Sequence, residues 1–147
     1  MRALGAPAGF AGGRCRASIG GVTLRVLLID DNDVFRHALE VLLTLRGDIE
    51  IAGSDPRGDD VVERCAQLRP DVLLVDYRLP GLDGVQITRL VREHRPEVSV
   101  VALTAAAGER EVEALLQAGA VACIGKDQPL DEIVDAVRSA ARVEATD

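Results

Sequence analysis

The chain has 147 residues, a length that suits one domain with a sizeable core and does not suit two. Its 24 acidic residues outnumber its 17 basic residues, and the net charge of -7 argues against direct binding of nucleic acid. The three cysteines, Cys15, Cys65 and Cys123, are widely spaced and indicate neither a disulfide framework nor a zinc site. Because no apolar stretch approaches the roughly 20 residues that span a bilayer, we expect a cytoplasmic protein without membrane contact.

The first part of the chain differs from the rest. Residues 1–23 are rich in glycine and lack helical or strand periodicity, so we predict a disordered or irregular N-terminal extension. A regular pattern then runs from residue 24 to about residue 142, and 143–147 form a short tail. We therefore predict one folded domain over residues 24–142.

Within this domain, short β-branched runs alternate with segments of helical periodicity, which is the pattern of a parallel α/β sheet. The predicted strands are 25–29, 50–53, 71–75, 98–103 and 121–124, and the predicted helices are 33–46, about 61–68, 84–94, 109–118 and 129–142. The third strand is apolar after its first residue, which is typical of a central strand covered on both faces. Five β/α units predict a flavodoxin-like, doubly wound five-stranded parallel sheet in the order 2-1-3-4-5.

Apolar residues at three- and four-residue spacing predict the buried face of each helix. In the first helix these residues are Val34, Ala38, Val41, Leu42 and Leu45. In the later helices they are Val61, Val62, Cys65 and Leu68, then Val85, Leu90 and Val91, then Val112, Leu115 and Leu116, and finally Leu130, Ile133, Val134 and Val137.

Polar residues follow four predicted strands at their carboxyl ends: Asp30 and Asp31, Asp76, Thr104, and Lys126. Ligand sites of open α/β sheets form at this edge, so we expect these side chains to converge. Neighbouring carboxylates call for a neutralising cation, and ligation by oxygen alone favours Mg²⁺. A carboxylate can also attack phosphorus, while a lysine and a hydroxyl group can bind phosphoryl oxygens.

Each of these residues also has an ordinary structural interpretation. Asp30 and Asp31 can cap a helix, Asp76 can cap a turn, Thr104 can be structural, and Lys126 can be solvated. Their coincidence at four strand ends favours a phosphoryl site over these interpretations.

The motifs VLLIDDND, VLLVDYRLPGLDG, VVALTA and CIGKD resemble those of receiver domains of two-component response regulators, the CheY-like superfamily, over about residues 24–142. The resemblance implies that Asp76 is the phosphoacceptor. It also implies that Mg²⁺ is bound by Asp30, Asp31, Asp76 and the main-chain carbonyl of Arg78.

By the same resemblance, Thr104 is the switch hydroxyl and Lys126 is the lysine typical of the family. Cys123 is a departure, because receivers commonly have at this position a Tyr or Phe whose ring moves upon phosphorylation. We interpret Cys123 as a small buried hydrophobe and not as a redox sensor, since nothing basic beside it would lower the thiol pKa.

The ending KDQPLDEIVDAVR is similar to that of receivers which precede LuxR-type (NarL-type) helix-turn-helix domains. Because no such domain follows, we expect a stand-alone receiver that is phosphorylated by a sensor histidine kinase or phosphotransfer protein. It would signal to a downstream protein through its 109–142 face, with a homodimer as an alternative. We expect a phosphoacceptor and not an enzyme, apart from self-catalysed phosphotransfer and autodephosphorylation.

Two other functions stay open. One is a pseudo-receiver, an adaptor that binds partners independently of phosphorylation. The other is the receiver part of a longer DNA-binding transcriptional regulator. A phosphatase of the haloacid dehalogenase type is disfavoured, because Arg78 stands where that family requires a second aspartate.

Overall fold

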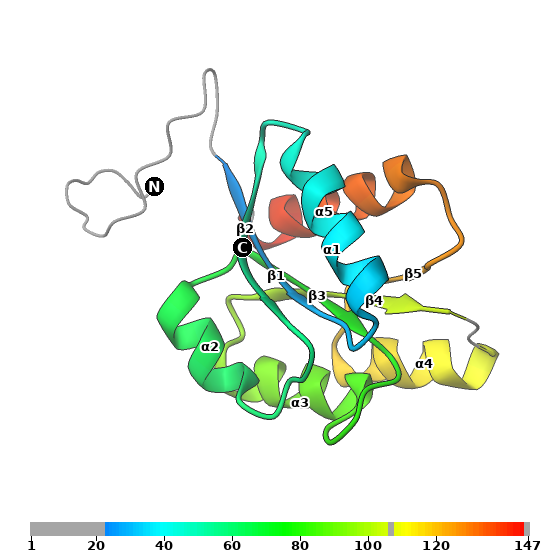
Figure 1. Ribbon diagram of the computed structural model, residues 1–147. Helices are drawn as coiled ribbons and strands as arrows, with labels where there is room; N and C mark the ends of the chain where they lie inside the picture. Colours follow the sequence, from blue (N-terminus) through cyan, green and yellow to red (C-terminus); the bar gives the residue numbers. More distant parts are fainter. Residues whose placement is uncertain (1–22, 106–107, 146–147) are drawn as a thin grey trace.

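The computed structural model describes residues 23–105 and 108–145, in which strands and helices alternate (Figure 1). The elements in chain order are β1 (Leu24–Ile29), α1 (Asp33–Thr44), β2 (Ile49–Asp55), α2 (Val61–Leu68), β3 (Val72–Asp76), α3 (Gly84–His94), β4 (Ser99–Thr104), α4 (Glu109–Ala118), β5 (Ala122–Gly125) and α5 (Leu130–Ala145). The predicted alternation is confirmed. Residues 1–22 of the extension predicted over 1–23, and the last two residues of the predicted tail, lie outside the described residues.

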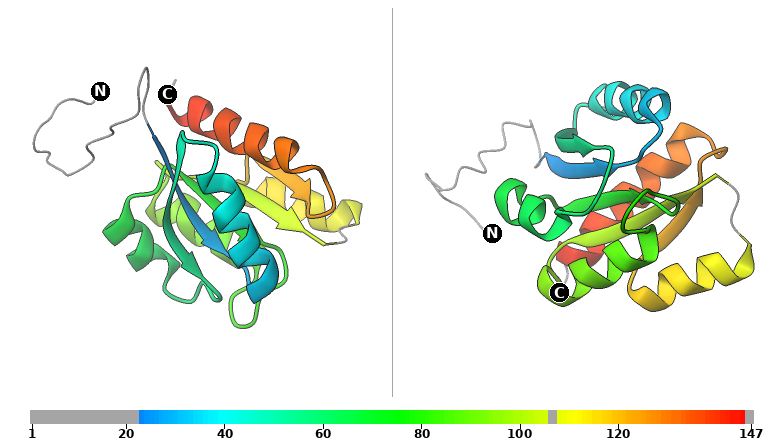
Figure 2. Two further views of the ribbon diagram at one scale, coloured as in Figure 1. Left: turned by 45° about the horizontal axis from the view of Figure 1, so that its top comes forward. Right: turned by 60° about the horizontal axis from the view of Figure 1, so that its bottom comes forward.

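The five strands form one parallel sheet in the predicted order, β2-β1-β3-β4-β5. α1 and α5 cover one face of this sheet, and α2, α3 and α4 cover the other (Figures 1 and 2). The register aligns the strand ends, because Ile29 pairs with Val75 and Asp76 pairs with Leu103. The carboxyl ends of β1, β3 and β4 therefore meet at one edge of the sheet.

The centre of the sheet is buried on both faces, since every residue of β3 and of β4 is buried. Alternate residues of β1 point to opposite faces. Val26 and Leu28 join the cluster under α1 and α5, whereas Leu27 and Ile29 join the cluster under α2, α3 and α4. This two-sided burial explains why the strand sequences are continuously apolar.

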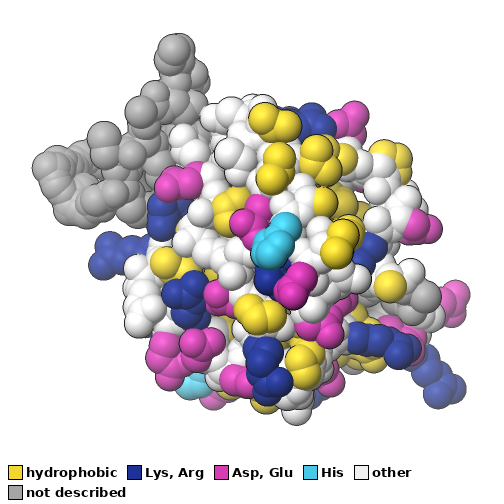
Figure 3. Space-filling view, in the orientation of Figure 1, with side chains coloured by type: hydrophobic (Ala, Val, Ile, Leu, Met, Phe, Trp, Pro, Cys, Tyr) yellow, Lys and Arg dark blue, Asp and Glu magenta, His cyan; other side chains and the backbone are white. Residues whose placement is uncertain are grey.

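The predicted buried face of α1 is wrong. Its members form an exposed face, which we call the apolar stripe of α1: Val34 (82% exposed), Ala38, Val41 (61%), Leu42 (42%) and Leu45 (75%). Figure 3 shows hydrophobic side chains gathered on the surface where α1 lies.

The face of α1 that packs on the sheet consists instead of Leu39 and Leu43, with the half-buried Phe35 beside them. These three residues also recur every four positions, so the helix carries two apolar stripes. Periodicity alone does not decide which stripe meets the sheet, whereas the contacts with β1 and α5 do.

The faces of the other helices follow the prediction more closely. Most of the predicted residues of α2, α3 and α5 are buried or half-buried. The prediction for α4 is wrong at Leu116, which is 46% exposed, whereas Leu115 is fully buried. Within the described ranges, no helix is long and apolar enough to cross a membrane.

Three elements end two or more residues away from their predicted ends. α1 ends at Thr44, before Gly47 with its positive φ of 83°, and α5 continues to Ala145. β2 extends to Asp55, two residues beyond its predicted end at residue 53. A register shift between Val26 and Leu27 passes over Ala52, a β-bulge that lets β2 continue pairing with β1 to its end.

Candidate functional site

The sheet brings the predicted site residues together at its carboxyl edge. Asp76 is the last residue of β3 and Thr104 the last of β4, while Asp30 directly follows β1 and Lys126 directly follows β5. The main-chain N–H of Lys126 donates to the Thr104 carbonyl at 2.7 Å, which joins the ends of β4 and β5. The convergence predicted from the strand ends is therefore present in the fold.

Three carboxylates form the acidic part of the site. Carboxylate oxygens of Asp30, Asp31 and Asp76 all lie within 4.8 Å of one another. Asp30 is fully buried and Asp76 is 6% exposed, whereas Asp31 lies at the surface. Burial, and next the negative charge of Asp30, raise the pKa of Asp76, although hydrogen bonds from Lys126 and the Arg78 main chain act in the opposite direction.

Lys126, the only lysine in the sequence, supplies the positive charge of the site. Its Nζ lies 2.7 Å from Asp30 Oδ2 and 3.2 Å from Asp76 Oδ2. Nζ also lies 4.6 Å from the centre of the Phe35 ring, a cation–π distance. Burial lowers the pKa of Lys126, but the two carboxylates outweigh burial and raise it overall.

The acidic cluster fits a divalent cation. Three ionised carboxylates beside one ammonium leave a formal excess of two negative charges, and all the side-chain donors are oxygens, which suit Mg²⁺. Asp30 Oδ1 accepts a hydrogen bond from the Asn32 N–H at 2.9 Å. Among the residues that the structure describes, the buried Oδ2 of Asp30 pairs with Lys126 at 2.7 Å and accepts no hydrogen bond of ordinary geometry, so it can act as a ligand.

Local sequence signals shape the two loops that hold these carboxylates. Asn32 caps α1 by accepting from the Phe35 N–H, directly after Asp31. Asp83 and Gln86 form a capping box at the start of α3. Gly84 lies against the chain at Asp76, where an added Cβ would come within 2.7 Å of the Asp76 carbonyl oxygen, and its N–H donates to the Tyr77 carbonyl at 2.9 Å.

Thr104 and Cys123 lie on the neighbouring strands β4 and β5. The Thr104 hydroxyl contributes a hydrogen bond that lowers the pKa of Cys123, but burial is the larger influence and raises it. Burial also raises the pKa of Cys65, to about 11. Both thiols are thus poor nucleophiles, which supports the interpretation that Cys123 is not a redox sensor. Cys123 is half-buried and not fully buried as predicted.

Arg78 and Ala105 lie at the rim of the site and are exposed. The assignment of the Arg78 main-chain carbonyl as a metal ligand stays a prediction. Two residues of the site were not predicted from the sequence. The ring of Phe35 packs against the ammonium of Lys126, and Gly84 allows the loop between β3 and α3 to approach Asp76. A glycine directly after the capping Asp83 is the one signal that could have pointed to Gly84.

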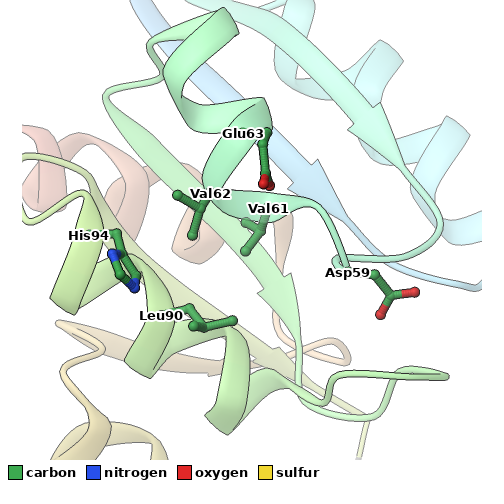
Figure 4. Close-up of a pocket in the computed structure, with 6 residues that line it drawn as sticks. All are labelled: Asp59, Val61, Val62, Glu63, Leu90 and His94. Atoms are coloured by element: carbon green, nitrogen blue, oxygen red, sulfur yellow. The ribbon is translucent and has the colours of Figure 1, made fainter.

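A hollow of about 310 Å³ lies elsewhere, between α2 and α3 (Figure 4). Its lining residues are Asp59, Val61, Val62, Glu63, Leu90 and His94. None of the predicted site residues contributes to this lining, and its side chains do not form a constellation suited to phosphoryl chemistry. The candidate site is therefore the acidic edge of the sheet and not this hollow.

Comparison with known proteins identifies the family. A family model described as the response regulator receiver domain matches residues 26–138, most of the chain. The chain belongs to the response regulator receiver family. Response regulators receive phosphoryl groups from histidine kinases, and receiver domains bind Mg²⁺ at an acidic pocket.

Individual relatives agree with this assignment. The chain is 32% identical over 124 residues to the response regulator protein VraR of Staphylococcus aureus, covering 84% of this chain and 59% of VraR. It is 34% identical to the signal receiver domain of the response regulator NarL from Mycobacterium tuberculosis, with a TM-score of 0.78 and coverage of 82% of this chain and 97% of that domain. A CheY-like receiver domain protein from Methanospirillum hungatei shares the fold, with 18% identity and a TM-score of 0.75. This match covers 84% of the present chain and 98% of the Methanospirillum chain. The chain thus spans less than two thirds of the VraR sequence.

Proposed function

We propose that this receiver accepts a phosphoryl group on Asp76 from a histidine kinase or phosphotransfer protein, in a reaction that depends on Mg²⁺. The observation that carries the proposal is the placement of the Asp76 carboxylate, which lies beside the buried Asp30 and shares the ammonium of Lys126 with it. The proposal applies both to a receiver that acts by itself and to a receiver within a longer regulator.

Asp76 is the best nucleophile of the three carboxylates. Asp30 is fully buried, so its carboxylate is not accessible to an incoming phosphoryl group. Asp31 is exposed and lies at the surface of the acidic cluster. Asp76 ends the central strand, retains slight exposure, and lies between the ends of the strands that carry Asp30 and Thr104.

The transfer conserves atoms and charge without a further reactant. An oxygen of the ionised Asp76 carboxylate forms a bond to phosphorus, while the bond from phosphorus to the donor's imidazole nitrogen breaks and leaves its electron pair on that nitrogen. Lys126 then pairs with a phosphoryl oxygen, and the Thr104 hydroxyl donates to another. A bound Mg²⁺, held by Asp30, Asp31 and Asp76, would supply positive charge that reduces the repulsion between these carboxylates and the incoming phosphoryl oxygens.

The conformational signal requires more than one contact. Reversing a population from 1:99 to 99:1 takes about 5.5 kcal/mol, whereas one charge-assisted hydrogen bond supplies about 1.5 to 3 kcal/mol. We infer that Thr104 and Lys126 both bind the phosphoryl group better in the active state, or that a partner supplies the rest. When the Thr104 hydroxyl turns toward the phosphoryl group it leaves Cys123, so the change would pass to β5 and the 109–142 face without a moving ring.

We assign the apolar stripe of α1 to contact with the phosphodonor protein. A donor must reach Asp76 over the edge where α1 begins, and the stripe starts at Val34, three residues after Asp31. An exposed apolar stripe continuous with the site thus suits a donor that presents its own apolar surface. A second copy of this chain is the competing occupant of the stripe.

Phosphorylation by a small acyl phosphate tests the proposed chemistry apart from any partner. Intact-mass spectrometry after incubation with acetyl phosphate should show the gain of one phosphoryl group with Mg²⁺, and little or none in the presence of a chelator. The adaptor function, favoured by Cys123 at the aromatic position, predicts no adduct and partner binding that is indifferent to both Mg²⁺ and the acyl phosphate. A beryllofluoride mimic separates this result from rapid loss of the phosphoryl group.

A further inference from the structure

Arg36, in the first turn of α1, is a buried charged residue next to the acidic site. It is 6% exposed although a guanidinium remains ionised in proteins. Burying such a charge is costly unless it is paired and hydrogen-bonded. The groups that Arg36 contacts therefore indicate the role of this buried charge.

The guanidinium contacts the loop between β1 and α1, strand β2, and the first residue of its own helix. Nη1 donates to the main-chain carbonyl of Asp30 at 2.5 Å, Nε donates to Ser54 Oγ of β2 at 3.1 Å, and Nη2 pairs with Asp33 Oδ1 at 2.8 Å. The Ser54 hydroxyl in turn donates to a carboxylate oxygen of Glu40, on the same helix as Arg36. Because this hydroxyl hydrogen is directed at Glu40, an oxygen lone pair of Ser54 is left to accept from Arg36.

The Asp30 carbonyl belongs to the peptide unit that joins Asp30 to Asp31. On the other side of Asp30, its N–H donates to the Asp55 carbonyl of β2 at 3.1 Å. The main chain of Asp30 is thus held by β2 directly and by Arg36, which is itself held by Ser54. Fixing this peptide unit fixes the directions from which the Asp30 and Asp31 side chains leave the backbone.

We propose that Arg36 is a positioning residue for divalent-cation binding, since it holds the Asp30–Asp31 peptide unit so that both carboxylates point into the acidic site. This inference rests on the proposed Mg²⁺ site. Groups that orient metal ligands typically change metal affinity about 10- to 100-fold when they are removed. Arg36 acts through main-chain geometry and touches no reacting atom.

The test is the Mg²⁺ dissociation constant, measured by isothermal titration calorimetry on the full chain. Arg36→Lys keeps the charge but loses the fork that spans Asp30 and Ser54, and its dissociation constant should rise about tenfold or more. Arg138→Lys is the matched control, because Arg138 forms a two-bond pair with Asp48 and no contact with the site. The control should bind Mg²⁺ within about twofold of wild type.

A kinetic measurement separates positioning from a merely structural role. At saturating Mg²⁺ the rate of phosphorylation of Arg36→Lys by acetyl phosphate should return to within about threefold of wild type, because the change raises the Mg²⁺ requirement only. A folded Arg36→Lys that binds Mg²⁺ as tightly as Arg138→Lys would overturn the inference. Failure of the wild-type chain itself to bind Mg²⁺ would overturn the proposed metal site and this inference together.

A second pair of variants decides the matter if Arg36→Lys does not fold. Ser54→Ala removes the acceptor that aims Arg36, while Ser54→Thr keeps a hydroxyl at the same position. The dissociation constant for Mg²⁺ should rise about threefold or more in Ser54→Ala and stay near the wild-type value in Ser54→Thr. Equal Mg²⁺ affinity in these two variants would contradict the role given to Arg36.

Discussion

Replacing Lys126 by methionine would remove the positive charge of the site while keeping most of the side-chain length. Its ammonium lies 2.7 Å from Asp30 Oδ2 and 3.2 Å from Asp76 Oδ2. At an effective dielectric constant of about 20, these distances correspond to attractions of about 6 and about 5 kcal/mol before desolvation is counted. Removing one partner of a buried pair typically costs about 3 to 5 kcal/mol, because the other charges stay behind. Since the Lys126 side chain is 15% exposed, we expect a loss of about 3 kcal/mol in the free energy of unfolding.

Urea unfolding at pH 7 without Mg²⁺, followed by circular dichroism, measures this loss. Arg138→Met is the control. The side chains of Arg138 and Asp48 are 34% and 36% exposed, so their ion pair should contribute less than about 1 kcal/mol to the free energy of unfolding. Adding Asp30→Asn to Lys126→Met should recover part of the stability, since the repulsion between Asp30 and Asp76 disappears. Equal losses in Lys126→Met and Arg138→Met, or no recovery in the double variant, would refute the electrostatic account of the site.

Three further predictions concern the loops, the charge and the surface of the site. Burial and the negative charge of Asp30 raise the pKa of Asp76, so stability is lost as the pH rises through the folded-state pKa and the carboxylate ionises. In Mg²⁺-free buffer, Asp76→Asn should therefore be more stable than wild type at pH 7. This gain in stability should vanish below the ordinary aspartate pKa of 3.8, and urea unfolding midpoints measured across pH check it. Gly84→Ala should lower the free energy of unfolding by about 1 to 3 kcal/mol, because the added Cβ would lie 2.7 Å from the main chain of Asp76 and 2.8 Å from that of Tyr77. An unchanged urea unfolding midpoint would contradict this contact. The double change Val41→Ser and Leu45→Ser should leave the free energy of unfolding within about 1 kcal/mol of wild type and leave labelling by acetyl phosphate unchanged. It should, however, slow phosphoryl transfer from a phosphodonor protein. A loss of self-association without slower transfer would assign the apolar stripe of α1 to a second copy of the chain.

The order of the elements and the convergence of the site could be predicted from the sequence because both follow from strong local patterns. Continuous apolar runs such as 72–75 are buried on both faces and leave little choice but a central parallel strand. Parallel strands have their carboxyl ends at the same edge, so the positions of Asp76 and Thr104 at strand ends were enough to bring them together. No knowledge of distances was required for that step.

The packed face of α1 could not be predicted, because Phe35, Leu39 and Leu43 share the helical spacing of the apolar stripe. Only contacts with the sheet, which are distant in sequence, select between the two faces. Hydrophobic periodicity also gives no indication that Arg36 is buried, because it assigns charged residues to the solvent-facing side of a helix.

Ser54 is one of the three partners that make the burial of Arg36 tolerable, and its place depends on the bulge at Ala52. A shift of one residue moves every following side chain of a strand to the other face of the sheet. The bulge therefore decides whether Ser54 faces α1. A local sequence pattern contains no clear signal of such an irregularity, so the network around Arg36 emerges only in the fold.

The location of the phosphoryl group tests the central claim most directly. After incubation with acetyl phosphate and Mg²⁺, reduction with borohydride converts an aspartyl phosphate to homoserine, and peptide mass spectrometry then identifies the converted residue. The account predicts conversion at Asp76, none at Asp30 or Asp31, and no conversion in Asp76→Asn. Conversion at another aspartate, or persistent labelling of Asp76→Asn, would contradict it.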